Sequence, residues 1–270
     1  MIYGPEHPES IRREVHMSGS CTIVIPTYNE ELNIVNMAKA IREAYPQFHI
    51  LFMDDNSTDK SKELIAALHD PMITFFVRNP KERGLAASVL QGFVECGTDF
   101  FICMDCDFQH PISALGGIYS KLESGADLTI GTRVNRRAMG LIRDLGSHAT
   151  EYYCKLFLFT RGKPLPEDLM SGLFGGRRGL WAPIINQHWD NYELTGWKVL
   201  LDMLKYGPGD IKMDKVYYMF ASRAQGKSHI SPKVVVTTFH QCGQFGKLIA
   251  KTVAAFTGID YNKMYTEKRE

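Results

Sequence analysis

Four carboxylates follow three short apolar runs of the sequence: Glu30, Asp55, Asp105 and Asp107. Like charges held close together are costly unless a cation or hydrogen-bond donors compensate them. Asp105 and Asp107 are two residues apart, so both can face the same way where a strand ends. With the amide oxygen of Gln109 they form an oxygen-only set that suits a hard cation such as Mg²⁺ or Mn²⁺. Since Mg²⁺ takes few protein carboxylates and completes its shell with water and phosphate, the set predicts a diphosphate ligand.

The same two aspartates have a second interpretation. They could be turn residues that cap a helix predicted after Pro111. A D-x-D pattern is too short to decide between the two. The acidic loops at Glu30 and Asp55 favour metal–diphosphate binding, because four carboxylates meeting at one edge need a compensating cation.

An alternation of strands and helices would position these loops. Apolar, β-branched runs predict the strands Cys21–Ile25, His49–Met53, Ile73–Val77, Phe100–Met104 and Asp127–Ile130. Helical periodicity between them implies βαβ units, hence a parallel, Rossmann-like sheet with helices on both faces. Ligands of such sheets sit outside the carboxyl ends of the strands, where the acidic loops are predicted. After Arg133 the alternation is lost, until Tyr217, Tyr218 and Phe220 form a strand-like run that we expect to complete the sheet.

Composition excludes several classes of protein. The chain has 270 residues with 31 Lys and Arg against 30 Asp and Glu, so its formal net charge of +1 indicates no nucleic-acid partner. No window of about 18 apolar residues lacks charges, and the first 20 residues hold no apolar signal core. The six cysteines are typical of a reduced protein with buried thiols. These features predict a cytoplasmic chain, in solution or peripheral to a membrane.

Two segments outside the predicted strands are basic and apolar. Residues 133–163 hold seven Lys and Arg against two acids, and residues 223–270 hold eight against three. We expect both to approach anionic lipid headgroups with apolar side chains in the interface. For residues 152–159, an amphipathic helix packed on the sheet is an equal alternative. The predicted organisation is a polar leader over 1–20, a catalytic domain over 21–230 and a basic amphipathic tail over 231–270.

Eight motifs occur in a specific order along the chain: IPTYNE at Ile25–Glu30, DDNSTD at Asp54–Asp59, RGLAASVLQGF at Arg83–Phe93, MDCDFQHP at Met104–Pro111, IGTR at Ile130–Arg133, SGLFGGRR at Ser171–Arg178, GWKVLLDML at Gly196–Leu204 and RAQGKSH at Arg223–His229. Together they resemble glycosyltransferase family 2, nearest to its dolichyl-phosphate mannose synthase branch. The resemblance covers about residues 21–230 and implies a GT-A fold.

The resemblance also implies roles for individual residues. The nucleotide pocket would consist of Pro26, Tyr28, Glu30, Met53, Asp55 and Met104. The metal on the diphosphate would be held by Asp105, Asp107 and Gln109. The acceptor phosphate would be bound by Arg133, Arg143 and Ser147, and Arg133 would join Asp105 and Asp107 as a catalytic residue. The residues that would close over the donor are Arg223, His229 and Lys198.

Two positions depart from the family pattern. His229 stands where the family has a lysine, a place that Lys227 could fill, and Asp202 stands where a glutamate is usual. Both give some weight to a degenerate nucleotide-sugar-binding protein without activity.

The predicted function is metal-dependent, inverting transfer of a hexose, with mannose from GDP-mannose to dolichyl phosphate as the best interpretation. A lipid phosphate is already anionic and needs little help from a general base, while arginine forks bind phosphate bidentately. The alternatives are a UDP-sugar enzyme that makes a glucosyl or N-acetylhexosaminyl lipid phosphate, and a family 2 enzyme that acts on a sugar hydroxyl. The expected location is the cytoplasmic face of a membrane, which leaves room for a membrane-anchoring subunit.

Overall fold

The computed structural model of the chain describes residues 20–134, 141–221 and 232–266, without the side chains of 141–147 and 266. Its strands are β1 (Cys21–Thr27), β2 (His49–Asp54), β3 (Ile73–Val77), β4 (Phe100–Cys103), β5 (Leu128–Arg133), β6 (Phe174–Arg177) and β7 (Met213–Tyr218). Its α-helices are α1 (Ile34–Ala44), α2 (Ser61–Ala66), α3 (Leu85–Glu95), α4 (Ser113–Glu123), α5 (Leu141–Phe159), α6 (Arg178–Gln187), α7 (Val199–Tyr206), α8 (Pro232–His240), α9 (Gly243–Thr257) and α10 (Tyr261–Thr266).

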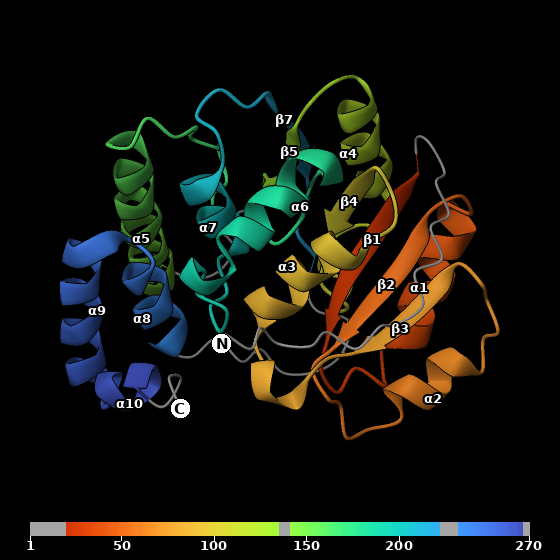
Figure 1. Ribbon diagram of the computed structural model, residues 1–270, viewed down its shortest axis with the longest axis horizontal. Helices are drawn as coiled ribbons and strands as arrows, with labels where there is room; N and C mark the ends of the chain where they lie inside the picture. The colour runs from red at the N-terminus through yellow and green to blue at the C-terminus, as the bar shows by residue number, and fades with distance from the viewer. Residues whose placement is uncertain (1–19, 135–140, 222–231, 267–270) are drawn as a thin grey trace, which may run out of the picture.

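The strands form one seven-stranded sheet in the order β3-β2-β1-β4-β6-β5-β7. All pairs are parallel except those that β6 makes with β4 and β5. The predicted α/β fold with a mostly parallel sheet is confirmed, and β7 completes the sheet beside β5 as expected (Figure 1).

The sequence pattern did not predict β6. Its four residues include two glycines and lack the β-branched pattern of the other strands. Both glycines are required by packing: a Cβ on Gly175 would lie 2.7 Å from the Phe101 carbonyl oxygen, and one on Gly176 would lie 2.7 Å from the Trp181 ring. The regular alternation of elements does stop after Arg133, but one antiparallel strand is inserted into the sheet beyond it.

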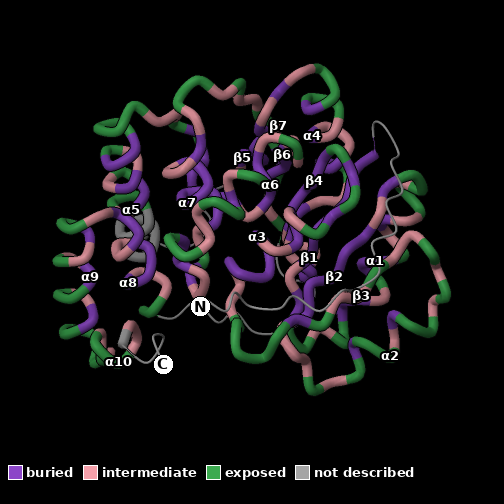
Figure 2. Tube along the Cα trace, in the orientation of Figure 1, coloured by how far each residue is buried: buried purple, intermediate pink, exposed green. Residues whose placement is uncertain are grey.

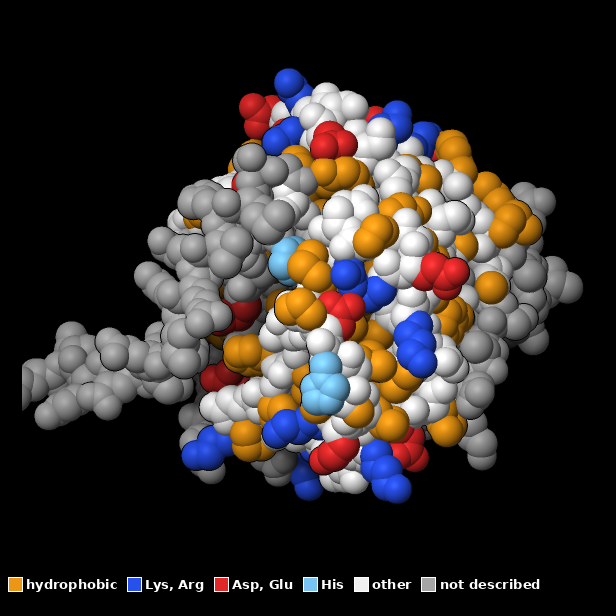
Figure 3. Space-filling model, turned by 90° about the vertical axis from the view of Figure 1, so that its right-hand side faces the viewer, with side chains coloured by type: hydrophobic (Ala, Val, Ile, Leu, Met, Phe, Trp, Pro, Cys, Tyr) orange, Lys and Arg blue, Asp and Glu red, His pale blue; other side chains and the backbone are white. Residues whose placement is uncertain are grey.

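Helices cover both faces of the sheet, and a hydrophobic cluster fills each side. One cluster lies between the sheet and α3, α6 and α7, and contains Trp181 and Phe93. The other lies under α1 and α4, and contains Phe52 and Ile118. The central strands are almost wholly buried (Figure 2). At the β3 end of the molecule, acidic and basic side chains are interspersed rather than gathered by sign (Figure 3).

The C-terminal helices α8–α10 gather with α5 at the end of the molecule far from β2 and β3 (Figure 1). Buried Asp202 on α7 accepts hydrogen bonds from the Gln241 amide at 3.0 Å and the Glu193 backbone at 2.9 Å, and pairs with Lys205 at 2.8 Å. Asp202, which departs from the family pattern, is therefore part of the packing that holds these helices.

The amphipathic helix expected around residues 152–159 is present, as part of α5. Cys154 and Leu158 are buried in the core, whereas Tyr152, Leu156 and Phe159 are exposed. The helix thus packs on the protein with one side and leaves an apolar stripe on the other. Within the described ranges, no helix is both long and apolar enough to cross a membrane.

Candidate functional site

Three loops meet at the carboxyl ends of β1, β2 and β4, as predicted from the parallel strands. The register places Thr27 opposite Asp54 and Val24 opposite Cys103, so the three strands end at one edge. Four non-glycine residues among those described have positive φ, and three of them lie in these loops: Asn29 at 56°, Asn56 at 63° and Phe108 at 61°. Such conformations cost of order 1–3 kcal/mol each and cluster at functional sites.

Hydrogen bonds tie the first two loops together. The Asn29 backbone N–H donates to Ser57 Oγ at 2.8 Å, and the Thr58 N–H donates to Asn29 Oδ1 at 2.8 Å. The Glu30 N–H donates to Ser61 Oγ at 3.2 Å. These bonds fix the segment of Tyr28 and Glu30 against the segment that begins at Asp55.

Three of the four predicted carboxylates surround one buried thiol. Burial raises the pKa of Cys106 well above its usual value, and the charges of Glu30, Asp107 and Asp105 raise it further. The charges of Glu30 and of the D-x-D pair therefore act on the same thiol at this edge of the sheet. Such a concentration of negative charge favours binding of a cation.

The fourth carboxylate, Asp55, is held by a residue that the sequence analysis missed. Arg78 is wholly buried, forms an ion pair with Asp55, and donates to Gln91 Oε1 at 2.8 Å. The backbone N–H of Gly84 donates to the other Asp55 oxygen at 2.7 Å. A lone arginine in a sequence usually indicates a solvated surface, so only the structure identifies Arg78 as the support of Asp55.

Beside Asp55, an arginine covers an exposed tyrosine. The Tyr28 side chain is half exposed, and the Arg83 guanidinium lies 4.7 Å from its ring centroid. Arg83 precedes Gly84, whose N–H bonds Asp55, so the three side chains Tyr28, Asp55 and Arg83 share one corner of the site. An aromatic face, an acceptor and a donor fork are groups that recognise a planar base.

Two predicted pocket residues do not present side chains to this corner. Met53 is fully buried in the cluster beneath α3, and Met104 is fully buried in the cluster beneath α4. Because both side chains are in the core, a contact with a nucleotide would have to come from their backbone groups. This contact stays a prediction. Pro26 lies on β1 opposite Met53 and is half buried.

The D-x-D loop presents one exposed and one buried carboxylate. Asp105 is 44% exposed, whereas Asp107 is buried and accepts the Gln109 N–H at 3.0 Å. The Gln109 side-chain amide donates to the Ala221 carbonyl at 3.4 Å, and the Ala221 N–H donates to the Gln109 carbonyl at 2.9 Å. In the described part of the chain, no three His, Cys, Asp or Glu side chains are arranged to hold a metal ion by themselves.

Arg133 is bound by a second residue that the sequence analysis missed. Its Nε and Nη2 donate to the two carboxylate oxygens of fully buried Asp168, at 2.7 and 2.8 Å. Burial lowers the pKa of Arg133, but the Asp168 pairing outweighs burial and raises it overall. The pKa of half-buried Lys198 is lowered overall. Burial, and then the charge of Arg133, lower it, while the charges of Asp168 and Asp105 act in the opposite direction. The structure thus brings Arg133, Lys198 and Asp105 into one electrostatic cluster.

Comparison with known proteins identifies the family. The model of the family described as glycosyl transferase family 2 matches residues 22–182, which is more than half of the chain. The chain belongs to this family. The matched region includes the three acidic loops, Arg133 and Asp168.

Alignments with individual relatives extend beyond the residues that the family model matches, and they agree with it. The family 2 chain is 28% identical over 235 residues to the dolichol-phosphate mannosyltransferase of Saccharomyces cerevisiae, covering 83% of this chain and 86% of the relative. It is 26% identical over 260 residues to the dolichol-phosphate mannosyltransferase of Pyrococcus furiosus, covering 90% and 70%. The predicted family and a hexosyltransferase are thereby confirmed, and these relatives carry the name dolichol-phosphate mannosyltransferase.

A solved structure confirms the GT-A fold of this family 2 glycosyltransferase. Glucosyl-3-phosphoglycerate synthase from Mycobacterium tuberculosis, solved with Mn²⁺, UDP and phosphoglyceric acid, superposes with a TM-score of 0.61. The identity is 16%, over 83% of this chain and 78% of that one. At this identity the likeness concerns the fold.

Several predicted site residues of the glycosyltransferase lie outside the described residues or side chains. Arg143 and Ser147 belong to the first turns of α5, whose side chains are not described. Arg223, Lys227 and His229 lie in 222–231, outside the described residues. Their roles stay predictions.

Gly84 gives a first test of the corner around Asp55. A Cβ at this position would lie 2.2 Å from the Leu194 carbonyl oxygen, so Gly84→Ala must push the loop away and weaken the bond to Asp55. We expect a loss of about 1–3 kcal/mol in the free energy of unfolding, together with weaker nucleotide binding. Denaturant titration and calorimetry measure both. Gly97→Ala is the matched control, because a Cβ there meets nothing within 4 Å. Equal behaviour of the two variants would contradict the prediction.

Proposed function

We propose that this glycosyltransferase transfers mannose from GDP-mannose to a polyprenyl phosphate of the dolichyl type, with inversion at the anomeric carbon and with a divalent metal. The observation that carries the proposal is the convergence of a base-recognising corner, an acidic D-x-D loop and a cationic cluster at one sheet edge. The names of the relatives, dolichol-phosphate mannosyltransferases, support the donor and the acceptor.

The D-x-D loop fits a divalent cation. Asp105, Asp107 and the amide oxygen of Gln109 are oxygen ligands on one loop, and the carboxylates around Cys106 are crowded enough to need compensation. Mg²⁺ or Mn²⁺ bound there would neutralise the charge that develops on the departing diphosphate. A site with two carboxylates suits a cation whose remaining ligands come from substrate phosphate and water.

The base-recognising corner fits guanine. The Asp55 carboxylate accepts hydrogen bonds only, and guanine offers two adjacent N–H groups on the edge that meets a carboxylate. Arg78 and Gly84 already fix the orientation of Asp55, which limits the cost of ordering the site on binding. Tyr28 would lie against the ribose or the base.

The cationic cluster fits the acceptor phosphate. Asp168 accepts from Nε and Nη2 of Arg133, so among the described contacts the two N–H groups of Nη1 and the second N–H of Nη2 are left to donate to a phosphate oxygen. A phosphate oxygen of the acceptor attacks the anomeric carbon, the bond from that carbon to the diphosphate oxygen breaks, and GDP leaves. Arg133 and Lys198 neutralise and align the attacking anion, so a separate general base is not required.

Thermal stabilisation by nucleotides tests this proposal first. We expect GDP with Mn²⁺ or Mg²⁺ to raise the unfolding midpoint, and UDP to have a much smaller effect, because a ligand stabilises the fold in proportion to its binding. Transfer from labelled GDP-mannose to dolichyl phosphate should then yield a lipid-linked mannose. A shift with UDP alone would replace the donor by a UDP-sugar. No shift with either nucleotide would contradict the proposed donor site itself.

We also propose that α5 and α9 face a membrane on the cytoplasmic side. Exposed apolar residues recur on one side of each helix: Tyr152, Leu156 and Phe159 on α5, and Phe245, Leu248 and Phe256 on α9. The two helices adjoin, since the rings of Tyr153 and Phe245 are 6.2 Å apart. Residues 232–266 hold four lysines and one aspartate, which favours anionic lipid.

Vesicle flotation tests this surface. Substituting Phe245, Leu248 and Phe256 together by serine should weaken binding to phosphatidylserine-containing vesicles at least about tenfold, since each apolar side chain contributes of order 1.5–3 kcal/mol when buried. Leu32→Ser is the control, because Leu32 is 60% exposed like Leu248 but lies in the loop between β1 and α1, away from α5 and α9. If the wild-type chain fails to float unless a membrane subunit is present, that subunit rather than lipid covers the patch.

A further inference from the structure

His110 is a buried imidazole with a polar partner on each ring nitrogen. Its Nδ1 lies 2.9 Å from the hydroxyl of Tyr218, and its Nε2 lies 3.4 Å from Oδ2 of Asp105. The side chain is only 2% exposed, so solvent cannot replace either partner. His110 follows the D-x-D pair on the same loop, whereas Tyr218 ends the edge strand β7.

The chemistry of Asp105 decides which nitrogen of His110 faces it with a proton. Asp105 can only accept when ionised, so a proton on Nε2 is the one that suits the Oδ2 atom 3.4 Å away. In the tautomer that carries the proton on Nε2, Nδ1 accepts from the Tyr218 hydroxyl. Burial raises the pKa of Tyr218, while the neighbouring Arg133 and a hydrogen bond with Ser171 lower it; the net shift is upward, which keeps the hydroxyl protonated as a donor.

Packing prevents the imidazole from turning away. The Phe220 ring lies edge-on to His110 with 5.4 Å between centroids. Gly172 closes the other approach, because a Cβ there would lie 3.4 Å from both His110 Nε2 and Asp105 Oδ2. The ring is therefore fixed in place as well as in tautomer.

We propose that His110, held in place by its contact with the Tyr218 hydroxyl, is a positioning residue that fixes the Asp105 carboxylate for metal binding. This inference rests on the proposed metal-dependent function. Asp105 is the more exposed of the two aspartates and projects from a loop, so it needs a partner that limits its rotation. Partners that orient a ligand in this way typically contribute 10- to 100-fold to metal affinity.

The experiment uses Tyr218→Phe and His110→Phe in the full chain. Tyr218→Phe removes only the hydroxyl that contacts Nδ1 of His110, and His110→Phe removes both ring contacts but keeps an aromatic ring. We expect the dissociation constant of Mn²⁺, measured by electron paramagnetic resonance in the presence of GDP, to rise about 10- to 100-fold in both variants. Binding of GDP without metal should stay near that of the wild type, while the unfolding midpoint of Tyr218→Phe without metal should fall, because a buried hydrogen bond of His110 is lost.

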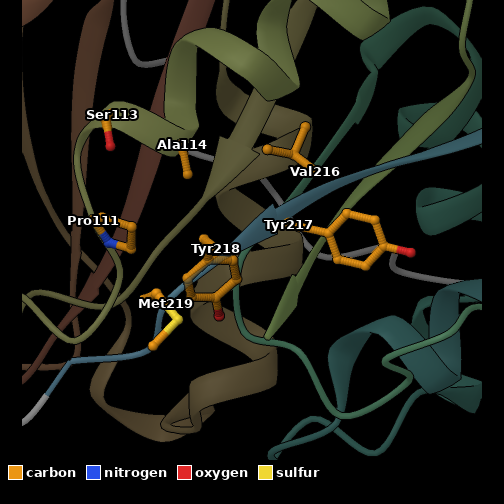
Figure 4. Close-up of a pocket in the computed structure, with 7 residues that line it drawn as sticks. All are labelled: Pro111, Ser113, Ala114, Val216, Tyr217, Tyr218 and Met219. Atoms are coloured by element: carbon orange, nitrogen blue, oxygen red, sulfur yellow. The ribbon is translucent and has the colours of Figure 1, made fainter. Parts of the chain in front are cut away.

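Tyr217→Phe is the matched control. Tyr217 is the preceding residue of β7, its ring turns in a different direction from that of Tyr218 (Figure 4), and its hydroxyl donates to Glu167 at 2.9 Å on the surface. Its Mn²⁺ affinity should equal that of the wild type. If Tyr218→Phe binds Mn²⁺ as tightly as Tyr217→Phe does, the inference is wrong, even if His110→Phe fails to fold. A wild-type chain without Mn²⁺-dependent GDP binding would overturn the proposed metal function, and the inference with it.

Discussion

Replacing Asp107 by alanine will reduce mannosyl transfer at least about 10³-fold, the scale on which loss of a group that stabilises developing charge acts. Asp107 is buried, and its charge acts on the Cys106 thiol together with the charges of Glu30 and Asp105. In the proposed function its carboxylate is a ligand of the divalent metal, which compensates this concentration of negative charge. The substitution removes that proposed ligand.

The fold should tolerate this change. Removing one charge from the cluster relieves repulsion, while the lost hydrogen bond from the Gln109 N–H costs about 1 kcal/mol. We expect the unfolding midpoint without metal to change little, and the extra stabilisation by Mn²⁺ with GDP to disappear. Differential scanning calorimetry with and without the ligands measures both.

Two further variants make this test specific. Asp107→Asn keeps an oxygen acceptor for Gln109 but removes the charge, and it should lose transfer as the alanine variant does. Asp214→Ala is the control. It removes an exposed carboxylate of β7 that pairs with Lys121 of α4 at 3.1 Å, and it should keep full activity. Metal-dependent transfer retained in Asp107→Ala would remove Asp107 from the site.

The sequence predicted those parts of the fold and the site that depend on local patterns. Strands such as Cys21–Thr27 are continuous β-branched runs, and the acidic loops follow them directly, so parallel pairing alone brings Glu30 near the D-x-D pair. The strand Phe174–Arg177 was missed because close packing requires glycine at Gly175 and Gly176, whereas strands are recognised in a sequence by β-branched and aromatic residues.

The supporting residues could not be predicted because their partners are remote in sequence. Arg78 reads as an ordinary surface cation until β2 and β3 pair and place it beneath Asp55. Tyr218 is 108 residues from His110, and Asp168 is 35 residues from Arg133. Nothing in their local sequence distinguishes these residues from polar residues of a loop or strand, so the pairings follow only from the tertiary fold.

Replacing Asp168 by alanine will destabilise the protein by about 3–5 kcal/mol and abolish efficient use of the acceptor. Asp168 is fully buried, and it accepts hydrogen bonds from Nε, Nη2 and the backbone N–H of Arg133. Without it, the largely buried guanidinium of Arg133 faces the ammonium of Lys198 with no bidentate acceptor. Urea denaturation gives the change in the free energy of unfolding, and the KM for dolichyl phosphate reports the displacement of Arg133.

Asp70→Ala is a matched control for burial. Asp70 pairs with Arg42 at 2.8 Å, close to the 2.7 Å of Asp168 with Arg133, but its side chain is 26% exposed rather than 0%. Exposed pairs contribute about 1 kcal/mol or less. A loss in Asp168→Ala no larger than that in Asp70→Ala would show that burial does not determine the strength of the pair.

A double substitution separates the structural role of the pair from its role in transfer. Replacing Arg133 by methionine and Asp168 by leucine removes both buried charges, and such apolar replacements are often neutral or stabilising. We therefore expect the double variant to recover most of the stability that Asp168→Ala loses, while transfer stays abolished because no guanidinium faces the acceptor phosphate. Recovery of transfer together with stability would mean that Arg133 serves the fold and not the reaction, and that Lys198 alone aligns the acceptor.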